Sequence, residues 1–157
     1  MFDLVNGLPV HPLVVHAVVV LLPLAVLGTI AIAVVPRWRT TYGPVVVGVA
    51  LVATALMPVA TSSGEELEHR VGDPGEHAQL GDQLIWFAIP LLVLSGLLVW
   101  LAHRAARSGA SAKGRPWLPT VVAGLAVVAG LAAGVQVYRV GDSGARAAWG
   151  GQVSSSP

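Results

Sequence analysis

Four long apolar stretches without an acidic or basic residue constrain this chain more than any other feature. They are 18 to 23 residues long, contain no Asp, Glu, Lys or Arg, and cover residues 13–35, 43–60, 84–102 and 117–137. At about 1.5 Å per residue such helices reach roughly 27–35 Å, the thickness of the hydrocarbon core of a bilayer. A soluble domain would instead show amphipathic helices with a polar stripe. The sequence therefore predicts an all-α integral membrane four-helix bundle.

The composition agrees with this class and excludes several functions. Hydrophobic residues make up 55% of the chain and charged residues 11%, and the formal net charge is +1. Because there is no basic face to neutralise phosphates, we expect no nucleic-acid partner. The absence of cysteine excludes disulfides, iron–sulfur ligation and c-type haem attachment. No nucleophile triad, phosphate loop or zinc-protease motif is present, so we do not expect an enzyme acting on its own.

The loops between the stretches differ in charge. Residues 36–42 and 103–116 are basic, whereas residues 61–83 carry six acidic residues against one arginine. Short basic loops stay in the cytoplasm, so both termini and the acidic loop are predicted to lie outside. We expect residues 1–157 to form one four-span domain with an outer lid over 61–83 and an outer tail over 138–157. The first stretch is expected to be retained as a span rather than cleaved as a signal peptide.

The acidic loop contains signals for helix starts. Ser62 and Ser63 each precede a glutamate by three residues, as in a capping box, and Asp73 with Pro74 is a second start signal. We therefore expect a short lid helix beginning near Ser62 and a break at 72–74. The third helix should then begin well before its apolar stretch. Asp142 and Ser143 similarly predict a final short helix after the fourth span.

Four of the five histidines fall on the predicted outer side: His11, His16, His69 and His77. His16 lies about one turn inside a span, where an ionisable group is costly and usually faces the bundle interior. Two interpretations of His16 stay open, a hydrogen bond to a loop carboxylate or carbonyl and ligation of a metal or haem. His103, beside Arg104, is expected only to favour the end of its helix.

Glu66 and His69 form a Glu-x-x-His motif, which places a carboxylate and an imidazole on one helical face. Di-iron bundles use two such motifs and two further glutamates. Because this chain has one, a solvated helix face explains the motif better than an iron site does.

The rise of a helix allows the depths of the histidines to be compared. His11 lies about 39 Å from Arg37 and His77 about 40 Å from Arg104, whereas His16 lies only about 31 Å from Arg37. If the two arginines share one plane, His16 is roughly 9 Å deeper than the other two, and a small ion or a hydrogen-bond network fits more easily than a haem between His16 and His77. We predict that His16 and His77 converge with at least one of His11, Glu66 and His69. The candidate cofactor ligands are His16 and His77, and the candidate metal ligands are His11, His16, Glu66, His69 and His77.

Small residues recur every four positions in the fourth stretch, at Ala126, Gly130 and Gly134. This spacing allows a neighbouring helix to approach closely, so we expect it to serve helix packing. Two alternatives remain, namely room for a flat cofactor and a homo-oligomer through the Gly130/Gly134 face.

Several segments together resemble a known family: residues 11–16 (HPLVVH), 63–69 (SGEELEH), His77 with Gly81, and 141–145 (GDSGA). They resemble small bacterial four-helix membrane proteins catalogued as a domain of unknown function. Ala17 departs from that pattern, because the family often has an aromatic residue there. The resemblance implies a multi-pass protein of the bacterial plasma membrane. Some relatives are fused to Rieske-type iron–sulfur domains, which implies an electron-transfer association and a respiratory or iron–sulfur protein as partner.

Three functions follow from these patterns. The first is a redox-associated membrane module whose outer histidines and carboxylates bind haem b or a non-haem metal ion. The second is a cofactor-free interaction or assembly subunit that docks a partner through its outer lid. The third, a transporter or channel, is the weakest, because spans two to four contain no charged residue to line a pathway. All three place the chain in a lipid bilayer.

Overall fold

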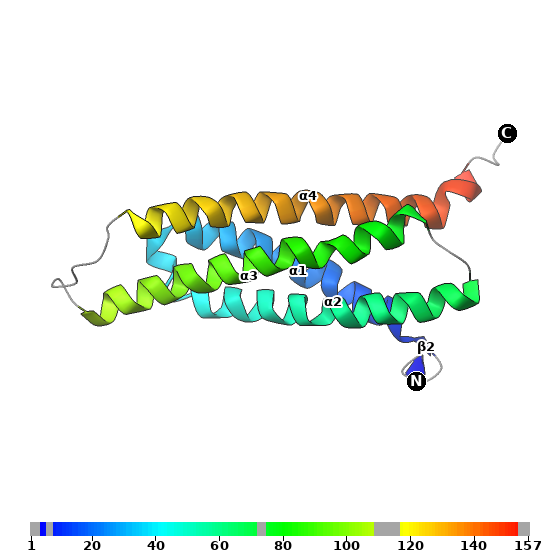
Figure 1. Cartoon of the computed structure of the whole chain (residues 1–157), viewed down its shortest axis with the longest axis horizontal. Coiled ribbons are helices and arrows are strands. Elements are labelled where there is room, and N and C mark those ends of the chain that lie inside the picture. The colour runs from blue at the N-terminus through cyan, green and yellow to red at the C-terminus, as the bar shows by residue number, and fades with distance from the viewer. Residues whose placement is uncertain (1–3, 6–7, 72–74, 109–116, 154–157) are drawn as a thin grey trace.

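Four long helices make up nearly all of the structure (Figure 1). The computed structural model describes residues 4–5, 8–71, 75–108 and 117–153, with the backbone alone at 4–10, 67–71, 148 and 150–153. Each helix is long and apolar enough to cross a membrane, which confirms the predicted all-α four-helix class. The helices are α1 (Val10–Val34), α2 (Gly43–Val71), α3 (Glu76–Ser108) and α4 (Leu118–Val153).

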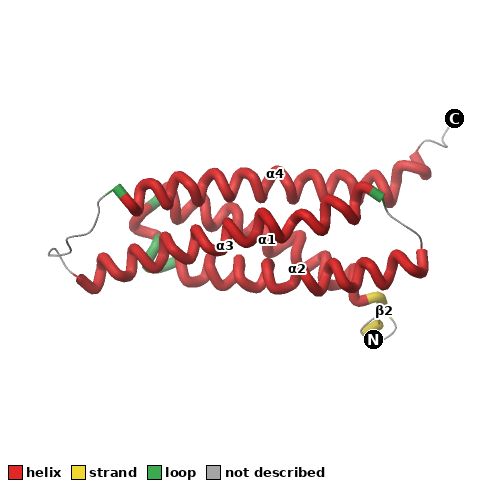
Figure 2. The backbone as a smooth tube through the Cα atoms, in the orientation of Figure 1, coloured by secondary structure: helices red, strands yellow, loops and turns green. Residues whose placement is uncertain are grey.

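Short elements precede α1 and follow it (Figure 2). Two strands of two residues each, β1 (Leu4–Val5) and β2 (Leu8–Pro9), pair antiparallel, with Leu4 opposite Pro9. A single 3₁₀ turn, η1 (Pro36–Trp38), connects α1 to α2. Because these elements are only two or three residues long, the four helices determine the architecture.

Successive helices run in alternating directions and form two hairpins. Helix α1 packs most extensively on α2, and α3 on α4, while α2–α3 and α1–α4 contacts close the ring. In Figure 1, α2 and α4 lie on opposite sides of the bundle, and α1 and α3 cross between them. We call the end where α1 and α3 begin, and where α2 and α4 end, the histidine end.

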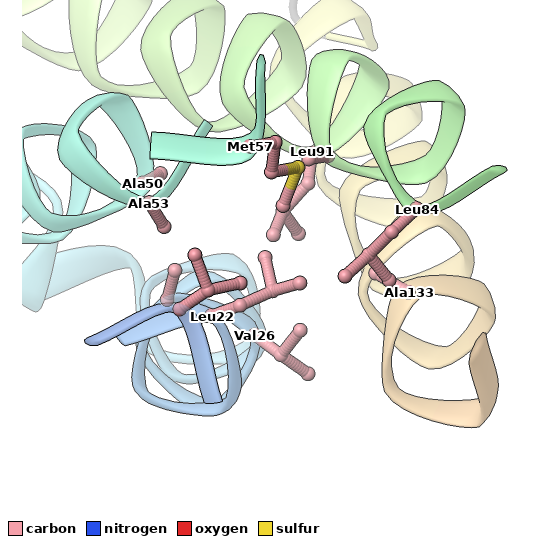
Figure 3. Packing of buried hydrophobic residues seen from close by; sticks show 11 residues of the cluster. Leu22, Val26, Ala50, Ala53, Met57, Leu84, Leu91 and Ala133 are labelled. Carbon is pink, nitrogen blue, oxygen red and sulfur yellow. The ribbon is translucent and has the colours of Figure 1, made fainter. Parts of the chain in front are cut away.

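The core is built from leucines set against small residues (Figure 3). Leu22 of α1 and Leu91 of α3 are essentially inaccessible, and they point toward the same interior as Ala53 of α2 and Ala133 of α4. Alanine at these positions lets helix backbones approach closely, and such packing drives helix association in lipid. The large side chains that remain exposed lie along the outside of the bundle, where lipid can surround them.

The small-residue face of α4 packs against α1. Ala126 is fully buried, and a Cβ added at Gly130 would lie 3.0 Å from Cγ1 of Ile30. At Gly134 the added Cβ would lie 3.7 Å from Cγ1 of Val26. The interpretation as helix packing is confirmed. The alternatives of a flat cofactor or a second copy on this face are wrong, because α1 already occupies it.

Helix α2 continues through the predicted lid. The expected helix start near Ser62 is wrong, because the Ser62 hydroxyl donates to Pro58 O at 2.8 Å and the Ser63 hydroxyl to Ala60 O at 3.0 Å. Both side chains thus bond carbonyls one turn back within α2, as serines in membrane helices do. The acidic connection is therefore an extension of α2 and α3 rather than a separate lid helix.

Helical backbone lies on both sides of the predicted break, with α2 ending at Val71 and α3 beginning at Glu76. Residues 72–74 themselves fall outside the described part of the chain. Gly75 has a φ of +64°, a left-handed conformation that favours glycine. The final short helix expected from Asp142 and Ser143 is wrong, because α4 runs uninterrupted past both of them.

Arginine and tryptophan side chains mark the end of the bundle opposite the histidine end. Arg39 donates from Nε to Ile32 O at 2.9 Å and from Nη2 to Ala33 O at 2.8 Å, so it satisfies carbonyls at the end of α1. Partial burial lowers the pKa of Arg39. Arg104 lies 5.3 Å from the centroid of the Trp100 ring, within cation–π range.

Candidate functional site

His11 is held against α2 at the histidine end. Its Nδ1 lies 2.9 Å from Ala60 O and 3.3 Å from Ser63 Oγ. The imidazole also packs against Gly64, where an added Cβ would lie 3.0 Å from the ring carbon Cε1. Glycine at residue 64 therefore leaves the space in which the His11 ring sits.

His77 is held against α4 in the same manner. Its Nδ1 lies 3.1 Å from Ser143 Oγ, and the Ser143 hydroxyl donates to Val140 O at 2.9 Å. A Cβ added at Gly144 would lie 2.9 Å from Cε1 of His77. Each hairpin thus contains one histidine at the start of its first helix and one Ser-Gly pair near the end of its second.

These hydrogen bonds orient both imidazoles, and the one made by His11 also determines which ring nitrogen donates. A carbonyl oxygen only accepts, so Nδ1 of His11 must donate to Ala60 O. Nδ1 of His77 pairs with the Ser143 hydroxyl, whose oxygen can accept from Nδ1 while its proton is donated to Val140 O. With the proton on Nδ1, the lone pair stays on Nε2, and no described residue makes a hydrogen bond to Nε2 of either ring. An imidazole whose Nδ1–H is held by a protein acceptor is oriented to ligate a metal through Nε2.

Both histidines lie on the core-facing sides of their helices. His11 shares its face with Val18 and Leu22, seven and eleven residues along α1, and both are buried. His77 shares its face with Leu84 and Ala88 at the same intervals in α3, again both buried. The two partly buried imidazoles therefore continue the core stripes of α1 and α3 to the histidine end.

His16 does not face the bundle interior, so that prediction is wrong. Its side chain is exposed, and its Nδ1 donates to Pro12 O in the preceding turn of α1. Five residues after His11, a side chain points about 140° away around the helix, which carries His16 out of the core stripe. The Pro12 carbonyl satisfies one ring nitrogen, so His16 does not need a partner inside the bundle.

The remaining candidates are not drawn into this arrangement. Glu66 is exposed, the side chain of His69 lies outside the described residues, and His103 donates to Val99 O at the opposite end of α3. Among the described residues, no group of three or more His, Cys, Asp or Glu is placed to hold a metal ion. Within the described part of the chain, the predicted grouping of His16 and His77 with His11 or Glu66 is therefore not formed. The outer histidines that bond to a neighbouring helix there are His11 and His77.

A buried polar network adjoins His77. Gln136 is only 2% exposed, and its Nε2 donates to Leu80 O of α3 at 3.0 Å. Arg139 Nη1 donates to Gln136 Oε1 at 3.4 Å. The Gln136 amide therefore links α4 to α3 about one helical turn from His77. The cationic side chain of Arg139, which bonds this amide, lies at the histidine end.

Sequence reasoning missed the serines and glycines that seat the two imidazoles. Ser63 and Gly64 were assigned to a helix start, and Ser143 to a cap, because each was considered only in its local context. Ser-Gly pairs stand at 63–64 and 143–144 but also at 95–96 and 108–109, so their recurrence alone does not identify the two that seat an imidazole. No comparable sequence pattern marks Gln136 as a residue of this network.

Comparison with known proteins adds one match. The family model described as Predicted membrane protein (DUF2231) matches residues 7–157, nearly the whole chain. No curated protein and no solved structure matches the chain.

Proposed function

The chain belongs to the DUF2231 family of predicted membrane proteins, and within that class we propose that it is a membrane module that binds a metal-centred cofactor through His11 and His77. One observation carries this proposal. Both imidazoles have Nδ1 hydrogen-bonded to a group of the neighbouring helix, and no described residue bonds Nε2 of either ring, so each Nε2 is available to a ligand as a Lewis base. Such pre-orientation is the arrangement that outer-sphere hydrogen bonds give to metal-ligating histidines.

Burial and helix position support the same assignment. The two rings continue the core stripes of α1 and α3, and each is seated in the space that a glycine leaves. A histidine that served only the membrane–water interface would not need a dedicated acceptor and a missing Cβ on the facing helix. His16 illustrates that simpler case, because it is exposed and bonded within its own helix.

The proposal is tested by the metal content of the detergent-purified protein. We expect a stoichiometric metal in the wild-type chain that is lost in His11→Ala and in His77→Ala, because each variant removes one Nε2 ligand. His16→Ala is the matched control, since it removes a histidine five residues from His11 in the same helix, and it should retain the metal.

Two results would count against cofactor binding. One is a wild-type protein without bound metal, which would favour the cofactor-free interaction subunit. The other is metal content that is the same in all four proteins. Circular dichroism of each variant establishes that any loss of metal is not a loss of helix.

We also propose that the histidine end faces away from the cytoplasm. Arg37, Arg39, Arg104 and Arg107 lie at the opposite end, and the loop over 109–116 adds Lys113 and Arg115 in sequence. Short loops rich in arginine and lysine are retained in the cytoplasm. Trp100, beside Arg104, fits the aromatic belt of that membrane interface.

Single cysteines provide the test of orientation, because the natural chain contains none. A membrane-impermeant maleimide added to intact cells is expected to label Gly75→Cys and not Ala110→Cys, with both labelled after permeabilisation. Labelling of Ala110→Cys alone in intact cells would reverse the proposed orientation.

A further inference from the structure

The two hairpins carry the same pattern in their first helices. When α3 is aligned to α1 by the 66-residue spacing between His11 and His77, six buried positions coincide. A hydroxyl residue is among them, Thr29 in α1 and Ser95 in α3, both with no exposed surface. The coinciding pairs are Val18 with Leu84, Leu22 with Ala88, Ala25 with Leu91, Thr29 with Ser95, Ile32 with Leu98, and Ala33 with Val99.

The second helices repeat as well. Aligning α4 to α2 by the 80-residue spacing between Ser63 and Ser143 superposes the Ser-Gly pairs that seat the two imidazoles. Both serines then make the same bond, each donating to the carbonyl three residues before it. Three buried positions of small residues also coincide, namely Gly43 with Ala123, Ala50 with Gly130, and Ala53 with Ala133.

This repetition relates the halves of the bundle by an approximate two-fold axis along its length. In Figure 1, a half-turn about the long axis exchanges α2 with α4 and the crossing helices α1 and α3 with each other. At the histidine end, α1 with α2 and α3 with α4 keep to opposite sides of this axis. His11 and His77 are equivalent under this rotation, and each lies on the core-facing side of its helix, so the repeat places them at the same level on opposite sides of the axis.

We propose that this two-fold arrangement binds a single iron porphyrin, with Nε2 of His11 and Nε2 of His77 as its two axial ligands. The inference rests on the proposed function and specifies its cofactor. Two equivalent Lewis bases on opposite sides of one axis are what a six-coordinate haem requires, because the porphyrin supplies the other four nitrogens. No group of three or more His, Cys, Asp or Glu that could hold a metal ion occurs among the described residues, whereas a protein site for a bare zinc or iron ion commonly uses three or four ligands.

The hydrogen bonds at Nδ1 of His11 and His77 favour a porphyrin over a ligand, such as a quinone, that binds by accepting hydrogen bonds. A quinone bound between two histidines would need N–H donors pointing at its carbonyl oxygens. In His11 the Nδ1–H group is already used on Ala60 O, and in His77 Nδ1 is already paired with Ser143 Oγ. The remaining ring nitrogen, Nε2, can donate an electron pair, so it is able to coordinate iron.

Ser143 is a positioning residue for this site. Its hydroxyl is the described hydrogen-bond partner of Nδ1 of His77, whereas Nδ1 of His11 has Ala60 O as well as Ser63 Oγ. Ser143→Ala should therefore release the His77 ring, while Ser63→Ala leaves the His11 ring bonded to the backbone. Loss of an outer-sphere partner of a metal-bound histidine typically costs about 10- to 100-fold in affinity. We expect a loss of about that size in haem affinity for Ser143→Ala and a smaller loss for Ser63→Ala.

Absorption spectroscopy of the full-length protein tests the inference. The chain is produced with added haem precursor, purified in detergent, and measured in the oxidised and dithionite-reduced forms. We expect one haem per chain, with the split bands of a low-spin, six-coordinate iron on reduction. His11→Ala and His77→Ala should each become high-spin or lose haem, and added imidazole should restore the low-spin spectrum in the variants that keep haem. His16→Ala and His103→Ala should match the wild type.

The outcomes separate this inference from the proposed function. Stoichiometric metal that depends on His11 and His77, without a Soret band, would overturn the porphyrin and leave the metal-binding proposal in place. A protein with neither metal nor a Soret band contradicts both. A low-spin haem that is unaffected by His11→Ala and His77→Ala also contradicts both, because the ligands would then lie elsewhere.

Discussion

Gly144→Ala is expected to weaken haem binding by about tenfold or more without destabilising the helix that carries it. The added methyl carbon would lie 2.9 Å from Cε1 and 3.2 Å from Nδ1 of His77. A side-chain ring at the end of two rotatable bonds can move aside at little cost, so the imidazole shifts rather than the backbone. Displacement of the ring breaks the alignment of Nε2 with the iron, and ligand misplacement of this kind costs about 10- to 100-fold in affinity. Titration of the apo-protein with iron protoporphyrin measures this effect.

Gly141→Ala is the matched control for this prediction. It lies three residues earlier in α4, and an added Cβ there would meet nothing within 4 Å. Replacing glycine by alanine inside a helix favours the helix by up to about 1 kcal/mol. Gly141→Ala should therefore bind haem like the wild type and unfold at an equal or higher temperature. Equal haem affinity of Gly144→Ala and Gly141→Ala would show that His77 is not an axial ligand.

Gly130→Leu is expected to destabilise the bundle by about 1–3 kcal/mol, the usual cost of overpacking a close-packed interior. A Cβ at residue 130 would already lie 3.0 Å from Cγ1 of Ile30 and 3.8 Å from the backbone oxygen of Val26. The rest of a leucine side chain would have to displace α1, since a backbone oxygen cannot move aside as a side chain can. Unfolding in a denaturing detergent, followed by circular dichroism or a gel shift, measures the change.

Gly124→Leu provides the comparison within α4. Residue 124 is exposed, with nothing within 4 Å of an added Cβ. There the leucine meets lipid and gains helix propensity, so we expect unchanged or slightly raised stability. Equal destabilisation by both substitutions would mean that α4 does not pack on α1 through Gly130.

The apolar stretches predicted the fold class because lipid removes most alternatives. A segment inside the hydrocarbon core must satisfy its backbone hydrogen bonds internally, so an apolar run of this length becomes a helix. For the same reason Pro23, Pro58 and Pro90 lie inside helices without ending them. Helix ends were predicted less well, because Ser62 and Ser143 can cap a new helix or bond back to the preceding turn. Their local sequence is compatible with either.

The proposed site draws in part on the sequence. His77 and, as a supporting ligand, His11 are predicted from their place among the outer histidines, and helix rise predicts that they lie at equal depth. His16 was chosen as a ligand because it lies inside an apolar span. The prediction that its side chain points into the bundle was wrong, because the side chain is exposed. Helix α1 is apolar around most of its circumference, so no polar stripe marks the side that faces lipid. The direction of His16 therefore depended on which side of α1 meets α2 and α4.

The sequence by itself determined the number of helices, their approximate lengths and the presence of histidines near one end. These properties follow from the hydrophobicity and length of single segments, because each segment partitions into the bilayer according to its own sequence. Only the tertiary structure decided which imidazole meets Ser63 and which meets Ser143, because residues 52 and 66 positions apart are brought together by helix pairing. The same packing made Gly64 and Gly144 the seats of the two rings. Side-chain packing between helices has no counterpart in the hydropathy of any one segment, so the site emerged only when the hairpins were assembled.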